Sequence, residues 1–548
     1  MSPWIQNYDP FSNAWLSTGV AAVPVLLLFY LLAVKKILAH YAAVWGFAAS
    51  MLLAGFVFGM PWHMVAGAVS AGVVFGIIRI AWTLLAAVFA YELTVESGHF
   101  EIIRESIGGI TPDRRLQVLL IAFAFGAILE GAGGGGAPVA IAGAMMVGLG
   151  FNPFAAAVLC LIANTSPVAF GGVGNPIRAL VAVTALPDAD VSAMVGRILP
   201  WTALMLPFWL VRSMTSWRNT FSVWPACLAC GGVFAAVQFY WSNYRDSALV
   251  DIIGGMATLA ALALFFKFWK PAHIWHYAHE PAPVIKIRQH SGGQILHAWL
   301  PFLLLSVFVV AWGMPSIKRV FDKTTLTVPV PGLHLQVIRV APVVDKPRAE
   351  PAVLDIAWFS CTGTATLLAG LISGPILGLS LGRTMRIFLR TCYRMRYSMV
   401  AILAMLGLGF VTRYSGMDAV LGLAMTHTGA LLFPFFGTML GWLGVALTGT
   451  DAGSNALFGS LQVITSQRLG LSPVLMAAAN SAGGVMGKMI DAQSIIVACA
   501  AVGEEGKEGD LFRAVLPHSI ALAAIVGVIV FLFAYFGQAW IPNGRVWP

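Results

Sequence analysis

Long apolar runs separated by short polar connections make up most of the chain. Twelve of them approach or exceed the roughly 20 residues that a helix needs to cross the hydrocarbon core of a bilayer. The pattern predicts an all-α polytopic membrane protein with about twelve transmembrane helices, in which residues 1–548 form a single membrane transport domain. The twelve runs are 17–34, 40–60, 64–92, 153–175, 197–213, 222–242, 249–267, 297–317, 353–382, 397–412, 472–500 and 514–537.

Two further apolar stretches are interrupted by glycines and by one carboxylate each. They cover residues 116–150, which include Glu130, and residues 436–467, which include Asp451. Backbone that leaves the helical conformation at membrane depth is tolerated only where it is buried in protein or lines a water-filled cavity. We therefore expect two re-entrant hairpins, each of which enters and leaves the membrane on the same side.

The interrupted stretches belong to an internal repeat. Glu130 opens "EGAGGGGAPVA" and Asp451 opens "DAGSNALFGS", and some thirty residues later the chain reads "ANTSPVAFGGVGNPI" and "ANSAGGVMGKMIDAQS". The number of crossings between them places the two hairpins on opposite faces of the membrane. The sequence thus predicts an inverted repeat, a recurrent feature of secondary transporters, whose sites form from discontinuous helices at the repeat interface. The first repeat covers about 40–213 and the second about 353–537.

Charged residues give an orientation. The five arginines between Arg383 and Arg396 have no acidic residue among them, which is typical of a cytoplasmic loop. Counting spans outward from this loop places both termini outside, together with an extramembrane loop at 318–351. That loop alternates apolar and polar residues around Pro331-Gly332, which predicts a β-hairpin. The mixed segment 98–115 indicates an interfacial helix followed by a turn.

Composition narrows the class of protein. Hydrophobic residues make up 59% of the chain and charged residues 10%, whereas ordinary soluble domains carry about a quarter charged residues. We assign the net charge of +9 to lysines and arginines in cytoplasmic loops, and not to a nucleic-acid-binding surface. Cys227 and Cys230 form a CxxC inside a predicted span, without a second pair, and are expected to pack helices. No metal site and no cofactor is predicted.

The glycine run Gly131 to Gly136 fits the GxGxxG spacing of dinucleotide-binding proteins. It lacks the strand and the βαβ unit that this motif requires, and close helix packing through small residues is its structural alternative. At the N-terminus of a half-helix, however, exposed backbone N–H groups can bind an anion. We therefore expect a substrate-binding site lined by Gly133, Gly134, Gly135, Gly136, Asn164, Thr165, Ser166, Asn175, Gly453, Ser454, Asn455, Asn480, Ser481 and Lys488.

Carboxylates at membrane depth are costly and are functional candidates. Glu130, Asp451 and Asp491 are the candidate proton-coupling residues, because burial favours the neutral form of a carboxyl group and allows it to exchange protons. The alternative for Glu130 and Asp451 is a structural hydrogen bond to the interrupted backbone. Asp491 and Lys488 are three residues apart, so the alternative for this pair is mutual neutralisation.

Four stretches resemble the lactate permease family of bacteria. They are "LEGAGGGGAPVAIAGAMMVGLGF" (129–151), "LCLIANTSPVAFGGVGNPI" (159–177), "GTDAGSNALFGSLQ" (449–462) and "AANSAGGVMGKMIDAQSIIVACAAVG" (478–503). The resemblance covers nearly the whole chain and implies an inner-membrane carrier of the ion transporter superfamily, which imports L-lactate, D-lactate and glycolate by proton symport. Gly135, Asn175 and Asp491 depart from the usual family motifs.

The sequence therefore predicts a proton-coupled importer of small 2-hydroxymonocarboxylates. Its partners would be the anionic substrate, protons and the lipid bilayer. A sodium-coupled carrier of another carboxylate is the alternative within transport. A membrane-embedded enzyme, with Glu130 and Asp451 as acid and base, is the alternative from another class. We expect no enzyme, because the sequence shows neither a nucleophile motif nor a metal-ligand cluster.

Overall fold

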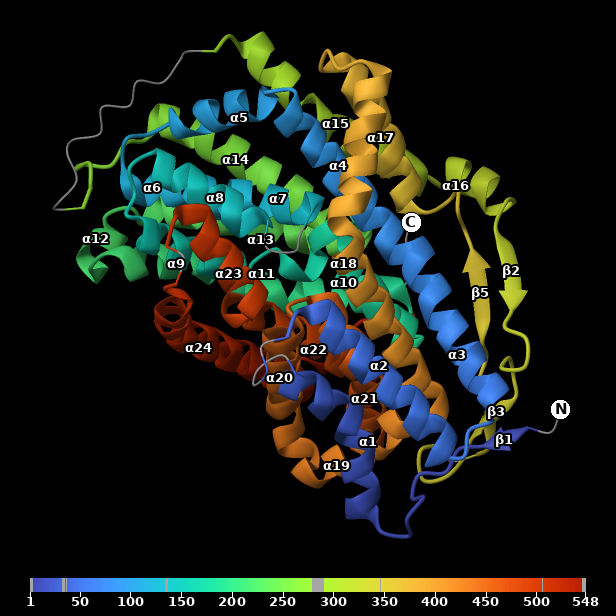
Figure 1. Cartoon of the computed structure of the whole chain (residues 1–548). Coiled ribbons are helices and arrows are strands. Elements are labelled where there is room, and N and C mark those ends of the chain that lie inside the picture. Colours follow the sequence, from blue (N-terminus) through green and yellow to red (C-terminus); the bar gives the residue numbers. More distant parts are fainter. Residues whose placement is uncertain are drawn as a thin grey trace.

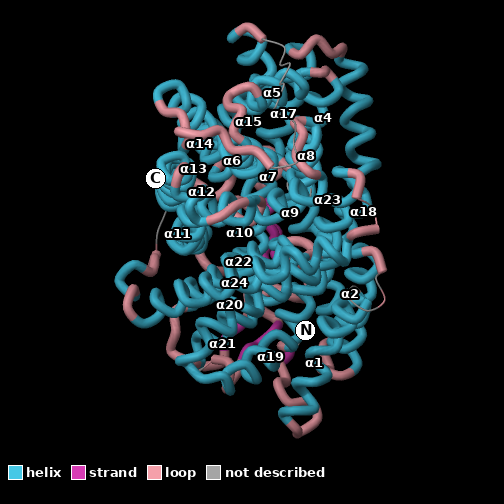
Figure 2. The backbone as a smooth tube through the Cα atoms, turned by 90° about the vertical axis from the view of Figure 1, so that its left-hand side faces the viewer, coloured by secondary structure: helices cyan, strands magenta, loops and turns pink. Residues whose placement is uncertain are grey.

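The computed structural model describes residues 3–31, 35, 37–133, 137–277, 290–344, 346–504 and 506–544. Within this part of the chain the molecule is almost entirely helical, with a few short strands along one side (Figures 1 and 2). Eight of the described helices are long and apolar enough to cross a membrane, and two bent helix pairs are further candidate spans. Each of the twelve predicted spans overlaps a helix, but the number of crossings stays a prediction.

The N-terminal part forms the following helices. They are α1 (Ala14–Phe29), α2 (Ala39–Phe56), α3 (Trp62–Phe75), η2 (Gly76–Ala81), α4 (Trp82–Glu96), α5 (His99–Gly108), α6 (Arg114–Val118), η3 (Leu119–Phe125), α7 (Gly126–Ala132), α8 (Ala137–Gly148), α9 (Pro153–Ala163), η4 (Val168–Phe170), α10 (Gly171–Thr184) and α11 (Asp188–Met214). Helix α5 confirms the helix predicted within 98–115.

The middle and C-terminal parts complete the bundle. The middle contains α12 (Trp217–Phe221), α13 (Trp224–Tyr244), α14 (Val250–Phe268), α15 (Gly292–Gly313) and α16 (Pro315–Asp322). The C-terminal part contains α17 (Thr362–Ile376), α18 (Leu381–Ser415), α19 (Met417–Met425), η5 (Thr426–Thr428), α20 (Gly429–Thr448), α21 (Asp451–Arg468), α22 (Pro473–Gly487), η6 (Lys488–Ile490), α23 (Ala492–Val502), α24 (Glu508–Tyr535) and η7 (Gln538–Trp540).

Both interrupted helices begin in the same way. The Asn152 side chain caps α9, which starts with Pro153, and the Ser472 side chain caps α22, which starts with Pro473. A capping side chain followed by proline is a strong helix start, because the cap accepts an otherwise unpaired N–H and proline needs no partner. The chain then bends by 63° between α9 and the η4–α10 segment, and by 41° between α22 and α23.

The backbone breaks fall at matching places in the two halves. Gly172 to Gly174 adopt left-handed conformations inside α10, with φ of 52°, 60° and 76°. A Cβ on Gly174 would lie 2.5 Å from the Ser247 carbonyl oxygen, so glycine is required there. Gly172 follows Asn164 by the same number of residues as Lys488, the first residue of η6, follows Asn480. Asn175 and Asp491 then occupy equivalent positions just after the breaks.

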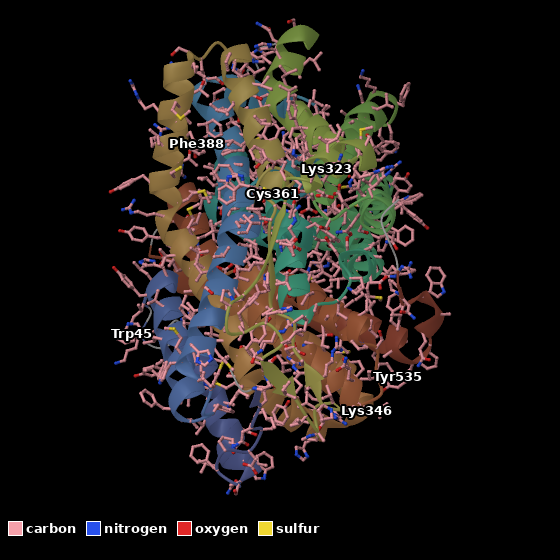
Figure 3. All side chains as sticks on the ribbon, turned by 90° about the vertical axis from the view of Figure 1, so that its right-hand side faces the viewer. Trp45, Lys323, Lys346, Cys361, Phe388 and Tyr535 are labelled. Carbon is pink, nitrogen blue, oxygen red and sulfur yellow. The ribbon has the colours of Figure 1, made fainter. Side chains whose placement is uncertain are left out.

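The strands correct one prediction. Strand β2 (Leu326–Pro329) pairs antiparallel with β5 (Val353–Ile356), whereas β3 (Val337–Arg339) pairs with β1 (Trp4–Ile5) and β4 (Arg348–Ala349). The predicted hairpin around Pro331-Gly332 is therefore wrong, because its two arms belong to different sheets. Figure 3 looks onto this side of the molecule and labels Lys323 and Lys346 near the two ends of the segment.

The arginine-rich segment is also not a loop. Arg383 to Arg396 all lie in the N-terminal half of α18, which has 35 residues and runs beside α2 and α3 (Figure 1). At 1.5 Å per residue such a helix is about 50 Å long, well beyond the roughly 30 Å of a hydrocarbon core. Three of the arginines form ion pairs with Glu92 or Glu96 at the end of α4. The cytoplasmic location of this segment stays a prediction.

The two predicted hairpins differ in form. In 116–150, the run Arg114–Ala132 is one helix of 19 residues, long enough to cross a membrane, and α8 follows it after the glycine run. In 436–467, α20 and α21 meet at Gly449 and Thr450. The re-entrant course of both segments and the inverted symmetry of the halves stay predictions.

Candidate functional site

Asp451 anchors the second interrupted stretch. It is the first residue of α21 and is 2% exposed. Its Oδ2 accepts hydrogen bonds from the Ser481 hydroxyl at 2.5 Å and from the Asn455 amide at 3.4 Å. Its Oδ1 has no hydrogen-bond partner among the described residues. Asp451 thus ties the start of α21 to the middle of α22.

Buried amides extend this cluster to the first half. The Asn480 side chain donates to Asn455 Oδ1 at 2.9 Å, and accepts a hydrogen bond from Gln462 at 3.2 Å. Asn455 in turn donates to the Pro176 carbonyl oxygen at 3.1 Å. Since Pro176 lies on α10, this bond joins the two halves directly. Gln462 was missed by the sequence analysis, because a lone Gln on a helix has no distinguishing spacing.

Lys488 and Asp491 form a buried ion pair at the second break. Lys488 Nζ lies 3.1 Å from Asp491 Oδ2, and the two side chains are 3% and 0% exposed. Lys488 also donates to the Gly449 carbonyl oxygen at 2.7 Å, so it connects η6 to the junction of α20 and α21. Asp491 caps α23 through the Ser494 N–H. The predicted proximity of the two side chains is confirmed.

Glu130 lies where the two halves meet. It is in the last turn of α7 and is 3% exposed. A Cβ on Gly171 would lie 2.6 Å from Glu130 Oε1, so α10 passes directly over the carboxylate. Lys488 and Asp491, from the second half, are close enough to act on its charge. Glu130 Oε2 has no hydrogen-bond partner among the described residues.

The polar residues of the first break are buried but poorly hydrogen-bonded. Asn164 faces Glu130, and neither polar atom of its side chain has a hydrogen-bond partner within the described chain; the same holds for the Ser166 hydroxyl and for Asn175 Oδ1. The Thr165 hydroxyl donates to the Ile162 carbonyl oxygen. Such atoms are expensive to bury, so this region has polar atoms available for further hydrogen bonds. Asp451 Oδ1 and Gln462 Oε1 in the second half are likewise without a partner among the described residues.

The predicted glycine donors are only partly placed. Gly133 ends α7, and Gly134, Gly135 and Gly136 lie outside the described residues. The Gly453 N–H donates to the Thr450 hydroxyl at 3.0 Å and the Ser454 N–H donates to the Thr450 carbonyl. Both N–H groups therefore form hydrogen bonds within the start of α21. The Ser454 hydroxyl donates to the Gly441 carbonyl oxygen.

Asp251 is a buried carboxylate that the sequence analysis did not single out. It is the second residue of α14 and is 0% exposed. A Cβ on Gly131 would lie 2.9 Å from Asp251 Cβ, which places Asp251 beside the Glu130 motif. A carboxylate at the edge of an apolar run is usually interfacial, so its position in the sequence does not predict that Asp251 lies in the interior.

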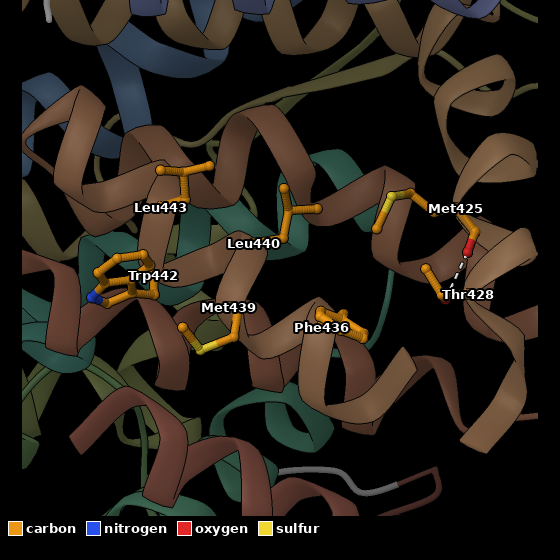
Figure 4. Close-up of a pocket in the computed structure, with 7 residues that line it drawn as sticks. All are labelled: Met425, Thr428, Phe436, Met439, Leu440, Trp442 and Leu443. Atoms are coloured by element: carbon orange, nitrogen blue, oxygen red, sulfur yellow. Dashed lines mark hydrogen bonds between the residues drawn. The ribbon is translucent and has the colours of Figure 1, made fainter. Parts of the chain in front are cut away.

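The described part of the chain also contains an apolar hollow, but no metal-binding cluster. A hollow of about 340 Å³ lies against α20 and is lined by apolar side chains such as Met439, Leu440 and Trp442 (Figure 4). It contains none of the candidate residues. Among the described residues, no group of three or more His, Cys, Asp or Glu side chains is arranged to hold a metal ion.

Comparison with known proteins places the chain in a family. A family model described as L-lactate permease matches residues 17–537. The glycolate permease of Escherichia coli (strain K12) is 44% identical over 98% of this chain and 99% of its own length. The L-lactate permease of Salmonella typhimurium (strain LT2) is 44% identical over 99% of this chain and 100% of its own length.

Among solved structures, the YdaH transporter of Alcanivorax borkumensis aligns with a TM-score of 0.46 and 13% identity over 88% of each chain. The family match and the apolar helices describe a multi-pass membrane protein, and the names of its relatives are those of transporters. This chain belongs to the L-lactate permease family.

Proposed function

We propose that this protein imports small 2-hydroxymonocarboxylates, namely lactate and glycolate, together with protons across a bacterial inner membrane. The observation that carries the proposal is the buried junction between the halves. There Asn455 donates to the Pro176 carbonyl oxygen, and Lys488 and Asp491 act electrostatically on Glu130. A secondary transporter needs its site at such an interface, where one part can move against the other.

The substrate carboxylate fits the chemistry of the first break. Asn164, Thr165, Ser166 and Asn175 supply neutral donors and acceptors, and Lys488 supplies positive charge from the second half. In this proposal the substrate fills the hydrogen-bonding capacity of Asn164 and Ser166, and draws Lys488 away from Asp491. Asn480 and Ser481 hold the second half in place around it.

Glu130 is the proposed proton carrier. Its unpartnered oxygen allows it to gain and lose a proton without breaking a hydrogen bond to the described residues. Protonation of Glu130 would compensate the charge of the incoming substrate, so that a neutral combination crosses the membrane. Loss of the proton on the cytoplasmic side would then release the substrate.

The first experiment measures transport in proteoliposomes. Wild-type protein should exchange labelled L-lactate in counterflow, and excess unlabelled glycolate should compete. An imposed pH gradient should drive accumulation, and replacement of Na⁺ by choline should leave it unchanged. Absence of counterflow with every 2-hydroxy acid would refute the substrate class, and loss of accumulation in choline would replace proton coupling by sodium coupling.

The second experiment uses Glu130→Gln. The variant should retain counterflow, because exchange needs no net proton movement, but lose accumulation driven by the pH gradient. Glu101→Gln is the matched control, since Glu101 lies on α5 with a side chain that is 55% exposed. If Glu130→Gln still accumulates lactate against its gradient, Glu130 is not the proton carrier.

The proposed topology places both termini outside and makes the two halves inverted repeats with hairpins at 116–150 and 436–467. Reporter fusions at each terminus test the orientation. An alkaline phosphatase fusion, which is active only outside the cytoplasm, should be active at both ends, and a fluorescent protein that folds only in the cytoplasm should be dark. The opposite pattern would reverse the orientation.

A further inference from the structure

Asp251 owes its position to a glycine of the Glu130 motif. Helix α14 packs along α7 and η3, and its closest approach is at Gly131. A Cβ at residue 131 would lie 2.8 Å from Ile252 Cγ1, 2.9 Å from the Ile252 nitrogen and 2.9 Å from Asp251 Cβ. Only glycine at position 131 lets α14 bring a second carboxylate against the residue that follows Glu130.

Asp251 and Glu130 are both buried, and each has at least one oxygen without a hydrogen-bond partner in the described part of the chain. Asp251 is 0% exposed and both of its oxygens are unpartnered, whereas Glu130 has one such oxygen, Oε2. The Asn164 side chain lies beside Glu130. A buried carboxylate without a partner costs several kcal/mol, and a nearby like charge adds to this cost. The arrangement therefore favours a proton on the pair.

Different charged groups act on the two carboxylates. Lys488 and Asp491 act electrostatically on Glu130, and Glu130 acts electrostatically on Asp251. The helices packed against α14 contribute few other ionisable side chains. Apart from Glu130 on α7, they are Cys227, Cys230, Tyr240 and Tyr244 on α13 and His297 on α15.

We infer that Asp251 is a second proton-coupling residue, which holds a proton and exchanges it with Glu130 during the transport cycle. The proton leaves an Asp251 oxygen and bonds to Glu130 Oε2, so that charge moves from one carboxylate to the other and nothing else is consumed. In the sequence, Asp251 lies between the two proposed repeats. This inference rests on the proposed proton symport.

The test replaces Asp251 by asparagine and compares it with Asp246→Asn. Asp246 lies in the turn before α14 and accepts hydrogen bonds from the Ala248 and Leu249 N–H groups, and an asparagine side-chain oxygen can accept the same bonds. Labelled lactate counterflow and lactate-driven proton uptake are measured on the same proteoliposomes. Asp251→Asn should keep counterflow while proton uptake falls to background, and Asp246→Asn should keep both.

The outcomes separate the inference from the proposed function. Wild-type protein without lactate-driven proton uptake refutes proton symport itself. Wild-type uptake that persists unchanged in Asp251→Asn refutes the role of Asp251 alone. Equal loss of counterflow and proton uptake in Asp251→Asn, with normal thermal stability, also refutes it, because the residue would then serve binding and not coupling.

A measurement on the wild-type protein covers the case in which the variant fails to fold. Dicyclohexylcarbodiimide reacts with protonated carboxyl groups in apolar surroundings, and mass spectrometry locates the resulting N-acylurea. Asp251 should be labelled at acidic pH, and the labelling should decline as the pH rises. No labelling of Asp251 at any pH would overturn the inference.

Discussion

Glu130 and Asp451 occupy corresponding places in the two halves, yet their surroundings differ. Each has one oxygen without a hydrogen-bond partner among the described residues, but Asp451 Oδ2 accepts a hydrogen bond from a serine hydroxyl, Ser481, and Glu130 has no such hydroxyl donor among the described residues. Asp451 begins a helix and Glu130 lies in the last turn of one. Negative charge is stabilised at a helix N-terminus and opposed at a C-terminus. The second half therefore uses its carboxylate as an anchor, and we expect the first half to exchange the proton.

The backbone breaks that follow the two carboxylates also differ from each other. The second break contains the charged residues Lys488 and Asp491, which pair with each other, and equivalent positions in the first break are the neutral Gly172 and Asn175. The second break is thus held by an ion pair of its own residues, while the first break contains neutral polar residues in the equivalent positions. Three pairs of variants test this difference.

The largest effect is expected from Lys488→Met. It leaves Asp491 buried without its ion-pair partner, and such a change costs about 3–5 kcal/mol. The double variant Lys488→Met, Asp491→Asn makes the second break as neutral as the first and should recover most of this loss. Thermal or SDS-induced unfolding in detergent measures both. A double variant as unstable as the single one would show that the pair does not act as a unit.

A smaller effect is expected when the glycine beside each carboxylate is replaced by alanine. A Cβ on Gly484 would lie 2.4 Å from Asp451 Oδ1, and a Cβ on Gly171 would lie 2.6 Å from Glu130 Oε1. Gly484→Ala should cost about 2–3 kcal/mol of stability, because Asp451 cannot move without losing its donors. Gly171→Ala should cost less, since Glu130 has no hydroxyl donor among the described residues comparable to Ser481 on Asp451, but should impair lactate-driven proton uptake. Equal stability losses would contradict the difference between the halves.

The sequence predicted the helices and the two interrupted stretches because membrane-spanning runs and glycine breaks are local signals. It also predicted the Lys488 and Asp491 contact, which depends only on their spacing. It did not predict the strand pairing, since β3 pairs with β1, which lies at the start of the chain. Pairing between distant strands depends on how the helices between them pack, and no local pattern encodes that.

The sequence analysis expected the arginines of α18 in a loop and did not single out Asp251, for a related reason. A row of arginines is typical of a loop, but here Glu92 and Glu96 of α4 pair with three of them on a helix. Gly131 allows Asp251 to lie in the interior. In both cases the deciding residue is far away in sequence.

The smallest effect is expected from one serine near the asparagine of each break, Ser481 directly after Asn480 and Ser166 two residues after Asn164. Ser481→Ala removes the shorter of the two hydrogen bonds to Asp451 Oδ2 and leaves the longer one from Asn455, which should cost about 1.5 kcal/mol in unfolding experiments. Ser166→Ala removes a hydroxyl that has no partner among the described residues, so stability should be unchanged or slightly higher. If the proposed function holds, Ser166→Ala should instead raise the KM for lactate. A stability loss for Ser166→Ala as large as that for Ser481→Ala would mean that both breaks are closed by their own hydrogen bonds.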